Sequence, residues 1–436
     1  MSTAHAVDDS TPHISDRAHR VAVVALHDGF FGCGTGAGQS NRRFIALLDE
    51  LLPHDTDLVI LPVALETSSP HADPEWHAQV CADLATSRRR IEVVPLDNGT
   101  GGRDRFVGVE AFDVLAGDAA ARIAEVQSRY QLGLAVLLDV PLFGAAARLV
   151  PTPGWQALVL PRSSAALHCP DNRERVGWER RRLHSAADTG TRIGAISPAM
   201  RSHLRDDLAL PDHSLINLYN GLTDADRRFA DPAGLLPPEA EPGFVLAMGR
   251  AVPWKGFDEL LEAWDLLHSS GHPLPHLVLA AVSEQAAPTR YQRHLQALAQ
   301  RSRAPVSLLT QFSAQVRGLL TLPGLRAVVV PSRVEPFGRI PLEAYAAGAV
   351  PVVATRTGGL VDLVVDGETG FTAPPCNPVE LARALAKALE LGDAHRERMR
   401  VAGEELLQRF DYRRNVQEFL HQLAPWSTGH PRVGIP

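Results

Sequence analysis

FVLAMGRAVPWKGF, Phe244 to Phe257, reads as a strand, a charged loop and the start of a helix. The apolar run Phe244–Gly249 predicts a buried strand, and the pattern Phe257–His268 predicts an amphipathic helix. Such units build doubly wound parallel sheets, in which helices cover both faces and ligands bind at the carboxyl ends of the strands. The stretch therefore predicts an α/β fold with a ligand site at the loop that holds Arg250 and Lys255.

The same alternation runs through both halves of the chain. Before this stretch, helical patterns such as Val109–Tyr130 separate the apolar strand segments Val21–Leu26, Leu58–Leu65, Ile91–Leu96, Leu134–Val140, Ala157–Pro161, Arg192–Ser197 and Ser214–Tyr219. After it come the strand segments His276–Val282, Val306–Thr310, Arg326–Pro331 and Val350–Thr355. We therefore expect two doubly wound, Rossmann-like parallel-sheet domains that face each other across a cleft.

Composition excludes several classes of protein. The 436 residues carry 43 basic and 50 acidic side chains and a net charge of −7, so no single-sign field favours nucleic acid or an anionic membrane as partner. No apolar run is long enough for an integral membrane segment, and the N-terminus lacks the apolar core of a signal peptide. Four scattered cysteines without a CxxC pair predict a reduced, cytoplasmic protein without a zinc site. The Ala-, Arg- and Pro-rich composition is typical of a high-GC bacterium.

Two charged constellations carry the chemistry. Arg250 and Lys255 stand at a strand end beside a helix start, which suits a diphosphate but also fits a loop with solvated charges. The second constellation is PSRVEPFGRIPLEAYAAG, Pro331–Gly348. Its two glutamates, Glu335 and Glu343, either bind vicinal hydroxyls, balance the dipole of the following helix, or form an acid/base pair of the hydrolase type.

In order and spacing, these two stretches and PVVATRTGGLVDLVVDGETGF (Pro351–Phe371) resemble the C-terminal half of family 4 retaining glycosyltransferases, glycosyl transferases group 1. The resemblance implies the GT-B fold, with two Rossmann-like domains and the active site between them. The polar composition of 1–18 predicts a disordered tail, and the Pro-, Asp- and Ala-rich segment 223–243 predicts a linker. Around them the resemblance implies an acceptor domain at 19–222, a nucleotide-sugar domain at 244–410, and a helix at 411–424 that crosses back to the first domain.

The resemblance also implies roles for individual residues. Arg250 and Lys255 would bind the donor diphosphate, Glu335 would contact the donor sugar, and Glu343 would bind the ribose hydroxyls. The remaining donor contacts would come from the backbone of Phe337, Gly338, Arg339 and Ile340 and, near the base, from Gln311 and Phe312.

In the N-terminal half, the glycine-rich loop His27–Asn41 follows the first strand and precedes the first helix. By resemblance, Gly36 and Gly38 would lie near the donor phosphates. His168 is the best local match to a histidine near the reacting carbon, although a loop histidine is more often structural, and His27 and Asp28 are rivals for the acceptor contact. A Cys/His nucleophile reading of Cys169 beside His168 has no further support.

The triplets Asp55-Thr56-Asp57 and Asp224-Ala225-Asp226 are interpreted as polar loops, so we expect no metal and no resident cofactor. The predicted function is retaining transfer of a sugar from a nucleotide-diphospho-sugar, UDP- or GDP-linked, to a hydroxyl of a small-molecule acceptor that is soluble. Two alternatives stay open: a nucleotide-sugar-binding regulatory protein of the same fold without transfer activity, and a sugar phosphorylase of similar architecture.

Overall fold

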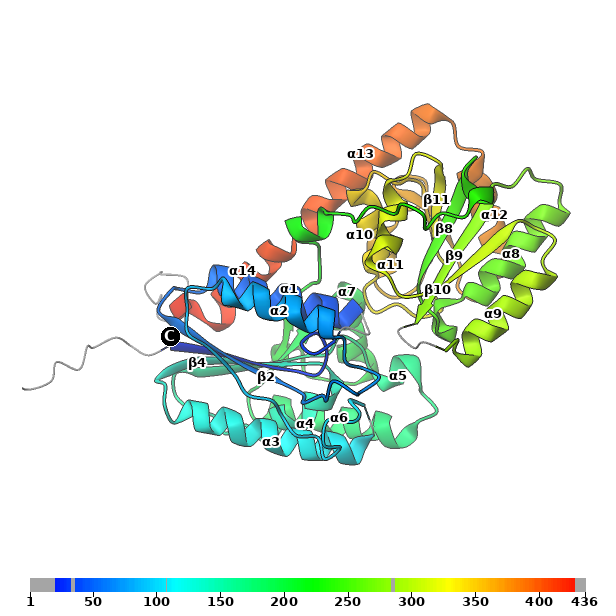
Figure 1. The fold of residues 1–436 in the computed structure, drawn as a ribbon. Coiled ribbons are helices and arrows are strands. Elements are labelled where there is room, and N and C mark those ends of the chain that lie inside the picture. Colours follow the sequence, from blue (N-terminus) through cyan, green and yellow to red (C-terminus); the bar gives the residue numbers. More distant parts are fainter. Residues whose placement is uncertain (1–19, 33–35, 107, 284–286, 428–436) are drawn as a thin grey trace, which may run out of the picture.

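The computed structural model describes residues 20–32, 36–106, 108–283 and 287–427. The chain forms two lobes, each built on one parallel sheet with helices on both faces (Figure 1). The predicted α/β fold with two doubly wound sheets is therefore confirmed. The predicted disordered tail at 1–18 lies outside the described residues.

The first sheet has seven strands in the order β3-β2-β1-β4-β5-β6-β7, all parallel. The strands are β1 (Arg20–Leu26), β2 (Thr56–Pro62), β3 (Ile91–Val93), β4 (Leu132–Leu138), β5 (Trp155–Leu160), β6 (Arg192–Ala195) and β7 (Leu215–Asn217). The central strands β1 and β4 are apolar and buried along nearly their whole length, as expected for a sheet covered on both faces.

The second sheet has six strands in the order β10-β9-β8-β11-β12-β13, also parallel. The strands are β8 (Phe244–Arg250), β9 (His276–Ser283), β10 (Val306–Gln311), β11 (Leu325–Val330), β12 (Val352–Thr355) and β13 (Gly370–Ala373). The pattern of the sequence did not predict β13, because its four residues GFTA include one large apolar side chain.

Helices cover both sheets. In the first lobe these are α1 (Gly36–Leu51), α2 (Pro74–Ala85), α3 (Val109–Gln127), α4 (Phe143–Ala146), α5 (Ala165–His168), α6 (Arg173–Asp188) and α7 (Pro198–Ser202). In the second they are α8 (Phe257–Ser269), α9 (Arg290–Arg301), α10 (Arg339–Ala346), α11 (Leu360–Leu363), α12 (Pro378–Leu389) and α13 (Asp393–Arg409).

The last helix, α14 (Tyr412–Leu423), returns to the first lobe and lies beside α1 (Figure 1). Phe419 on α14 packs against Phe44 on α1, with ring centroids 6.0 Å apart, and Arg413 pairs with Glu50. The chain thus connects the two lobes twice, once between β7 and β8 and once between α13 and α14. No helix within the described part of the chain is long and apolar enough to cross a membrane.

Candidate functional site

Two loops of the second lobe pack directly against each other. One follows β8 and includes a short 3-10 helix, η6 (Pro253–Lys255), and the other joins β11 to α10. Gly256 has a φ of +65°, and a Cβ at this position would lie 2.1 Å from the carbonyl oxygen of Pro331. The amide of Arg333 donates to the carbonyl of Trp254 at 2.8 Å. Only glycine permits this approach, so the two loops hold a fixed relative position.

The contact between the loops brings Lys255 and Glu335 together. Lys255 Nζ donates to the Glu335 carboxylate, and both side chains are largely buried. Ser332 Oγ lies 3.3 Å from the same carboxylate oxygen. Arg250 ends β8 and is exposed at the same edge of the sheet. The structure thus gathers three of the predicted donor residues at the carboxyl ends of β8 and β11.

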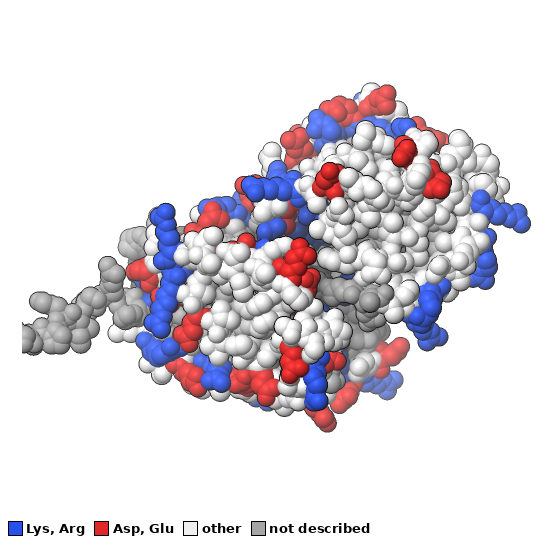
Figure 2. All heavy atoms as spheres, in the orientation of Figure 1, with Lys and Arg blue, Asp and Glu red and all other residues white. Residues whose placement is uncertain are grey.

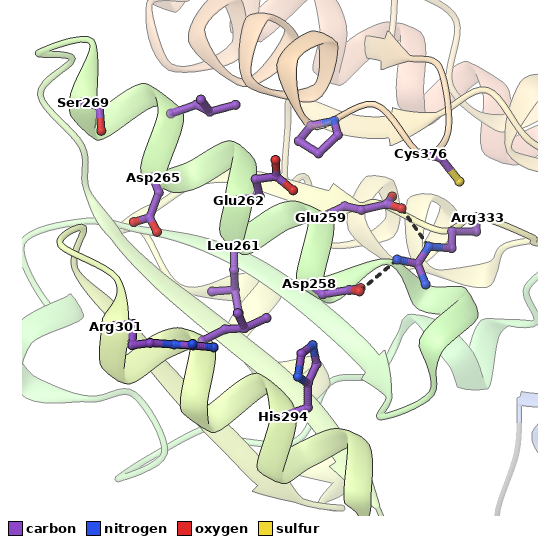
Figure 3. A pocket seen from close by; sticks show the side chains of 13 residues that line it. Asp258, Glu259, Leu261, Glu262, Asp265, Ser269, His294, Arg301, Arg333 and Cys376 are labelled. Atoms are coloured by element: carbon purple, nitrogen blue, oxygen red, sulfur yellow. Dashed lines mark hydrogen bonds and ion pairs between the residues drawn. The ribbon is translucent and has the colours of Figure 1, made fainter.

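Arg333, in the loop after β11, stabilises the contact between the two loops. Its guanidinium donates to Asp258 Oδ2 at 2.8 Å and to Glu259 Oε1 at 2.7 Å (Figure 3). It also donates to the carbonyl of Pro253 at 3.0 Å. A surface groove of about 690 Å³ lies on this side, lined by α8, α9 and the start of α12. The groove shares Arg333 with the loops but does not reach Lys255 or Glu335.

The Pro-Phe-Gly turn leads into α10. Gly338 caps the helix with a φ of +94°, and a Cβ there would lie 2.6 Å from Leu360. Phe337 is buried with its ring 6.1 Å from that of Phe410, and Ile340 is partly buried. By helix geometry the first amides of α10 have no acceptor within the helix, so this terminus favours an anion.

Glu343 lies deeper than the sequence suggested. It is 7% exposed, and its carboxylate contacts Arg339 Nε and Arg317 Nε, each at 3.4 Å. Arg339 also donates to Asp226 Oδ1 at 3.0 Å, and Arg43 on α1 donates to the same oxygen at 3.1 Å. These five residues form the junction cluster, which joins α1 of the first lobe to α10 of the second.

The junction cluster corrects the interpretation of Asp224-Ala225-Asp226 as a polar loop. Asp226 is 1% exposed, and it also accepts from the amide and hydroxyl of Thr223 at 2.9 and 2.8 Å. Burial alone would raise the pKa of Asp226, but the guanidinium groups of Arg339 and Arg43 and the bonds from Thr223 hold it well below its usual range. Asp224 and Ala225 are exposed, as expected for a polar loop.

The first lobe contributes His168 to the site. Its ring centroid lies 5.0 Å from that of Trp254 in the loop after β8, at an interplanar angle of 41°. Burial lowers the pKa of His168 to about 4, and the charges of Arg250 and Lys255 act in the same direction, whereas Glu335 opposes them. His168 is therefore a neutral imidazole beside the loop that follows β8. Ser197 Oγ also bridges the lobes, donating to the carbonyl of Pro336 at 2.7 Å.

Polar residues follow three adjacent strands of the first sheet. Asp28 after β1 accepts from Arg105 Nη1 at 2.5 Å, Asp139 after β4 accepts from Asn41 at 2.9 Å, and Arg162 after β5 donates to Asn41 at 2.5 Å. Burial raises the pKa of Asp139 to about 6, and its φ is +79°. Sequence analysis missed Asp139 and Arg162. A signal was available for Arg162, which directly follows the predicted strand segment Ala157–Pro161, whereas Asp139 lies inside the predicted segment Leu134–Val140, and the observed strand ends one residue before it.

The other predicted residues of the first lobe lie around this network. His27 Nε2 lies 3.1 Å from the carbonyl of Arg105, and burial lowers the pKa of His27 to about 3. Gly36 begins α1 and is exposed, whereas a Cβ on Gly38 would lie 2.9 Å from the Asp28 carboxylate. Gly38 is thus required by Asp28 packing under α1.

In the second lobe, Gln311 and Phe312 stand at the carboxyl end of the edge strand β10, and both are exposed. Basic and acidic side chains gather where the two lobes meet, on the face that Figure 2 shows. Among the residues that the structure describes, no three His, Cys, Asp or Glu side chains gather in a way that would hold a metal ion.

Part of the chain matches known proteins. Residues 236–406 match the family model described as glycosyl transferases group 1. The chain is 33% identical over 178 residues to a glycogen synthase from Mycobacterium tuberculosis, covering 40% of this chain and 41% of that protein. It is 36% identical over 174 residues to D-inositol 3-phosphate glycosyltransferase 2 from Catenulispora acidiphila, covering 38% and 39%. The chain thus spans about two fifths of the length of these curated relatives.

Solved structures extend the likeness to both lobes. Sucrose-phosphate synthase from Thermosynechococcus elongatus superposes with a TM-score of 0.71 at 19% identity, over 94% of this chain and 98% of that one. HepE from Anabaena, solved in complex with UDP-glucose, superposes with a TM-score of 0.66 at 18% identity, over 93% and 99%. These likenesses show that the two lobes are arranged as in the GT-B fold.

Proposed function

Residues 236–406 match the glycosyl transferases group 1 model, and from that match we propose that the chain is a retaining glycosyltransferase. It moves a sugar from a nucleotide-diphospho-sugar to a hydroxyl of a small soluble acceptor in the cytoplasm. The observation that carries the proposal is the pairing of Lys255 with Glu335 at the ends of β8 and β11, beside His168.

The donor is held by the second lobe. Arg250 and Lys255 receive the diphosphate, with the start of α10 as a further source of positive potential. Glu335 accepts hydrogen bonds from hydroxyls of the donor sugar, so donor binding places Lys255 between a carboxylate and a phosphate. Lys255 is one of two lysines among 43 basic residues. Its ammonium is a compact point charge, unlike the planar guanidinium of the arginines that make up the rest of that count.

The nucleoside lies beyond the diphosphate. Glu343 accepts from the ribose hydroxyls, and to do so its carboxylate is shared between them and the arginines of the junction cluster. Gln311 and Phe312 lie near the base, where an exposed aromatic ring offers a stacking surface. The proposed donor is UDP- or GDP-linked, and the UDP-glucose that HepE holds supports the first of these.

The reaction proceeds on one face of the sugar. The bond from the anomeric carbon to the diphosphate oxygen breaks as Arg250 and Lys255 neutralise the leaving group, and the acceptor oxygen bonds to that carbon from the same face. The acceptor proton passes to a phosphate oxygen of the leaving group. The neutral imidazole of His168 accepts a hydrogen bond from a sugar hydroxyl near the reacting carbon. Preorganised charge and position supply the rate in this scheme, which includes no metal.

A protection experiment tests donor binding at Lys255. An amine-reactive reagent modifies the accessible lysines, and mass spectrometry reports the extent at each one. UDP, GDP, ADP and dTDP, as free nucleotides and as sugar conjugates, are added in turn. We expect one nucleotide to protect Lys255 while Lys387, exposed on α12, reacts unchanged. Equal modification of Lys255 with and without every nucleotide would contradict the diphosphate role.

Turnover is tested separately. Lys255→Ala is expected to abolish release of nucleoside diphosphate in the presence of acceptor, with a circular dichroism spectrum like that of the wild type. Lys387→Ala is the matched control and keeps full activity. A protein that only binds nucleotide sugars would show protection of Lys255 but no release with any acceptor, and that result would refute the proposed transfer.

A further inference from the structure

Three side chains that the proposed mechanism does not use form a hydrogen-bonded chain beneath α5. Ser164 Oγ lies 2.8 Å from His203 Nε2, and His203 Nδ1 lies 2.7 Å from Asp207 Oδ2. Ser164 and His203 are 2% and 6% exposed, whereas the side chain of Asp207 reaches the surface. The three hydrogen-bonded side chains therefore connect the solvent-exposed Asp207 to the buried start of α5.

Local backbone geometry brings the last two residues together. His203–Asp207 forms a π-helix directly after α7, closed by a bond from the amide of Leu208 to the carbonyl of His203. Segments of π-helix are rare and recur at functional sites. The wider turn sets His203 and Asp207 on one side, with the imidazole directed toward Ser164.

The arrangement resembles the Ser-His-Asp set of hydrolases, but two observations exclude a nucleophile. Such a serine must be reached by substrate and must stand beside amide donors for the oxyanion. Ser164 is buried, and the adjacent amide of Ala165 already donates to Glu179 Oε2 at 2.7 Å. The three residues therefore serve the protein rather than a substrate.

What they hold is the start of α5. Ser164 is the N-cap of this helix, yet its side chain makes no capping bond, because its hydroxyl pairs with His203 instead. Glu179, which receives the Ala165 amide, is 2% exposed and is held by Arg175 at 2.8 Å. A four-residue helix has little stability of its own. These two buried anchors therefore determine where α5 begins.

The other end of α5 is His168. Ser164 and His168 are four positions apart, which is about one helical turn, so displacement of the first residue displaces the second. His168 Nδ1 is buried and has no hydrogen-bond partner within the described structure, and its ring contacts Trp254 in the donor loop. Within the described structure, the orientation of the His168 ring is therefore fixed by packing and not by a hydrogen bond of its Nδ1.

We propose that Ser164, His203 and Asp207 are positioning residues that orient His168 toward the reacting sugar. The inference rests on the role of His168 in the proposed function. Ser164 takes no part in the chemistry, and its contribution to the rate passes through His168.

A double-mutant cycle separates this role from general stabilisation. Ser164→Ala is expected to lower kcat by about 10-fold to 100-fold, the range for a reacting group displaced by about 1 Å. The Kd for the nucleoside diphosphate stays unchanged, because the second lobe supplies its contacts. In a His168→Ala background, Ser164→Ala is expected to lower kcat less than twofold further. Effects that multiply would overturn the proposal.

Conservative variants of His203 sharpen the cycle. His203→Gln places a side-chain amide near the former Nε2 and keeps the bond to Ser164, so its kcat should stay near that of the wild type. His203→Asn loses that bond, so its kcat should fall as in Ser164→Ala. The matched control is His184→Asn, which removes a 2.9 Å bond to the carbonyl of Leu208 beside the π-helix and does not touch α5. A fall of kcat in His184→Asn equal to that in Ser164→Ala would indicate a merely structural role.

A spectroscopic arm does not depend on activity. In protein labelled at histidine, the ring protons of His168 are assigned by their loss in His168→Ala, and Trp254 shifts them by its ring current. Ser164→Ala and His203→Asn are expected to move these signals toward free-histidine positions, while His184→Asn leaves them in place. If the His168 signals do not move in Ser164→Ala and His203→Asn, the positioning role is overturned. If they move but the wild type transfers no sugar, only the proposed function is overturned.

Discussion

Replacing Asp226 by asparagine is expected to destabilise the protein strongly, because the variant removes the carboxylate that Arg43 and Arg339 share and leaves Arg339 only its longer contact with Glu343. Arg339 and Arg43 both donate to Oδ1, and the amide and hydroxyl of Thr223 donate to Oδ2. Breaking one partner of a buried ion pair costs about 3–5 kcal/mol. The Arg43 side chain is 24% exposed and regains water in part, so we expect about 3 kcal/mol.

Thermal unfolding measures this loss. For a domain of 150–250 residues, each kcal/mol shifts Tm by about 2–4 °C, so Asp226→Asn should lower Tm by about 6–12 °C. The matched control is Asp224→Asn, two positions away and exposed, which should stay within about 2 °C of the wild type. A Tm of Asp226→Asn equal to that of the control would show that the junction cluster contributes nothing, and the reasoning would be refuted.

The pH dependence gives an independent check. The folded pKa of Asp226 lies below the unfolded value of about 3.9, so the native state binds fewer protons. Its stabilisation is fully present above the unfolded pKa and is lost as the pH falls through the folded pKa. The gap in Tm between the wild type and Asp226→Asn should therefore be constant at neutral pH and should narrow only below about pH 4.

Three further variants test the packing of the site. Gly256→Ala places a Cβ against the Pro331 carbonyl and should raise the donor Kd at least tenfold, whereas Gly271→Ala, with a φ of +79° and open space, should leave the Kd unchanged in the same titration. Ser197→Ala removes an interlobe hydrogen bond and the N-cap bond from the Met200 amide, so it should cost about 1–2 kcal/mol in denaturant unfolding; no loss would contradict both contacts. Arg333→Lys cannot make three bonds in one plane, so the donor KM should rise while kcat changes less.

Much of the fold was predictable because its strands are buried on both faces. The segments Val21–Leu26 and Phe244–Gly249 are continuous apolar runs, and their observed bounds differ by one residue from the predicted ones. The short strand β13 was not predictable, since its register depends on pairing with β12 and on Gly370, where a Cβ would lie 1.9 Å from the Val352 carbonyl. The local sequence pattern identifies strands that are long and apolar. It misses short strands whose position depends on pairing with a neighbouring strand.

The same distinction holds for the site. Lys255 and Glu335 were predictable because each follows an apolar strand, and parallel strands end at one edge. Asp226 was not, because an Asp-x-Asp triplet in a Pro-rich segment has the pattern of a solvated loop. Its burial depends on Arg43 and Arg339, which are remote in sequence and on different lobes. No local pattern contains that pairing.

Helix α1 connects the two sides of the site. Asn41 and Arg43 are two positions apart, so their side chains project about 200° apart around the helix. Asn41 faces the first sheet, where it donates to the Asp28 carbonyl and to Asp139 and accepts from Arg162. Arg43 faces the junction and pairs with Asp226, which holds Arg339 on α10.

Two sets of polar contacts, joined by the backbone of α1, therefore lie between the strand ends of the first lobe and Glu343 in the second. Asp139 and Arg162 belong to the first set, and the junction cluster is the second set. In the proposed function, the Glu343 carboxylate turns toward the ribose of the donor, which would loosen its contact with Arg339. Arg339 shares Asp226 with Arg43 on α1. The proposed ribose role of Glu343 therefore predicts that donor binding alters the Arg43 contact and, through α1, the contacts of Asn41.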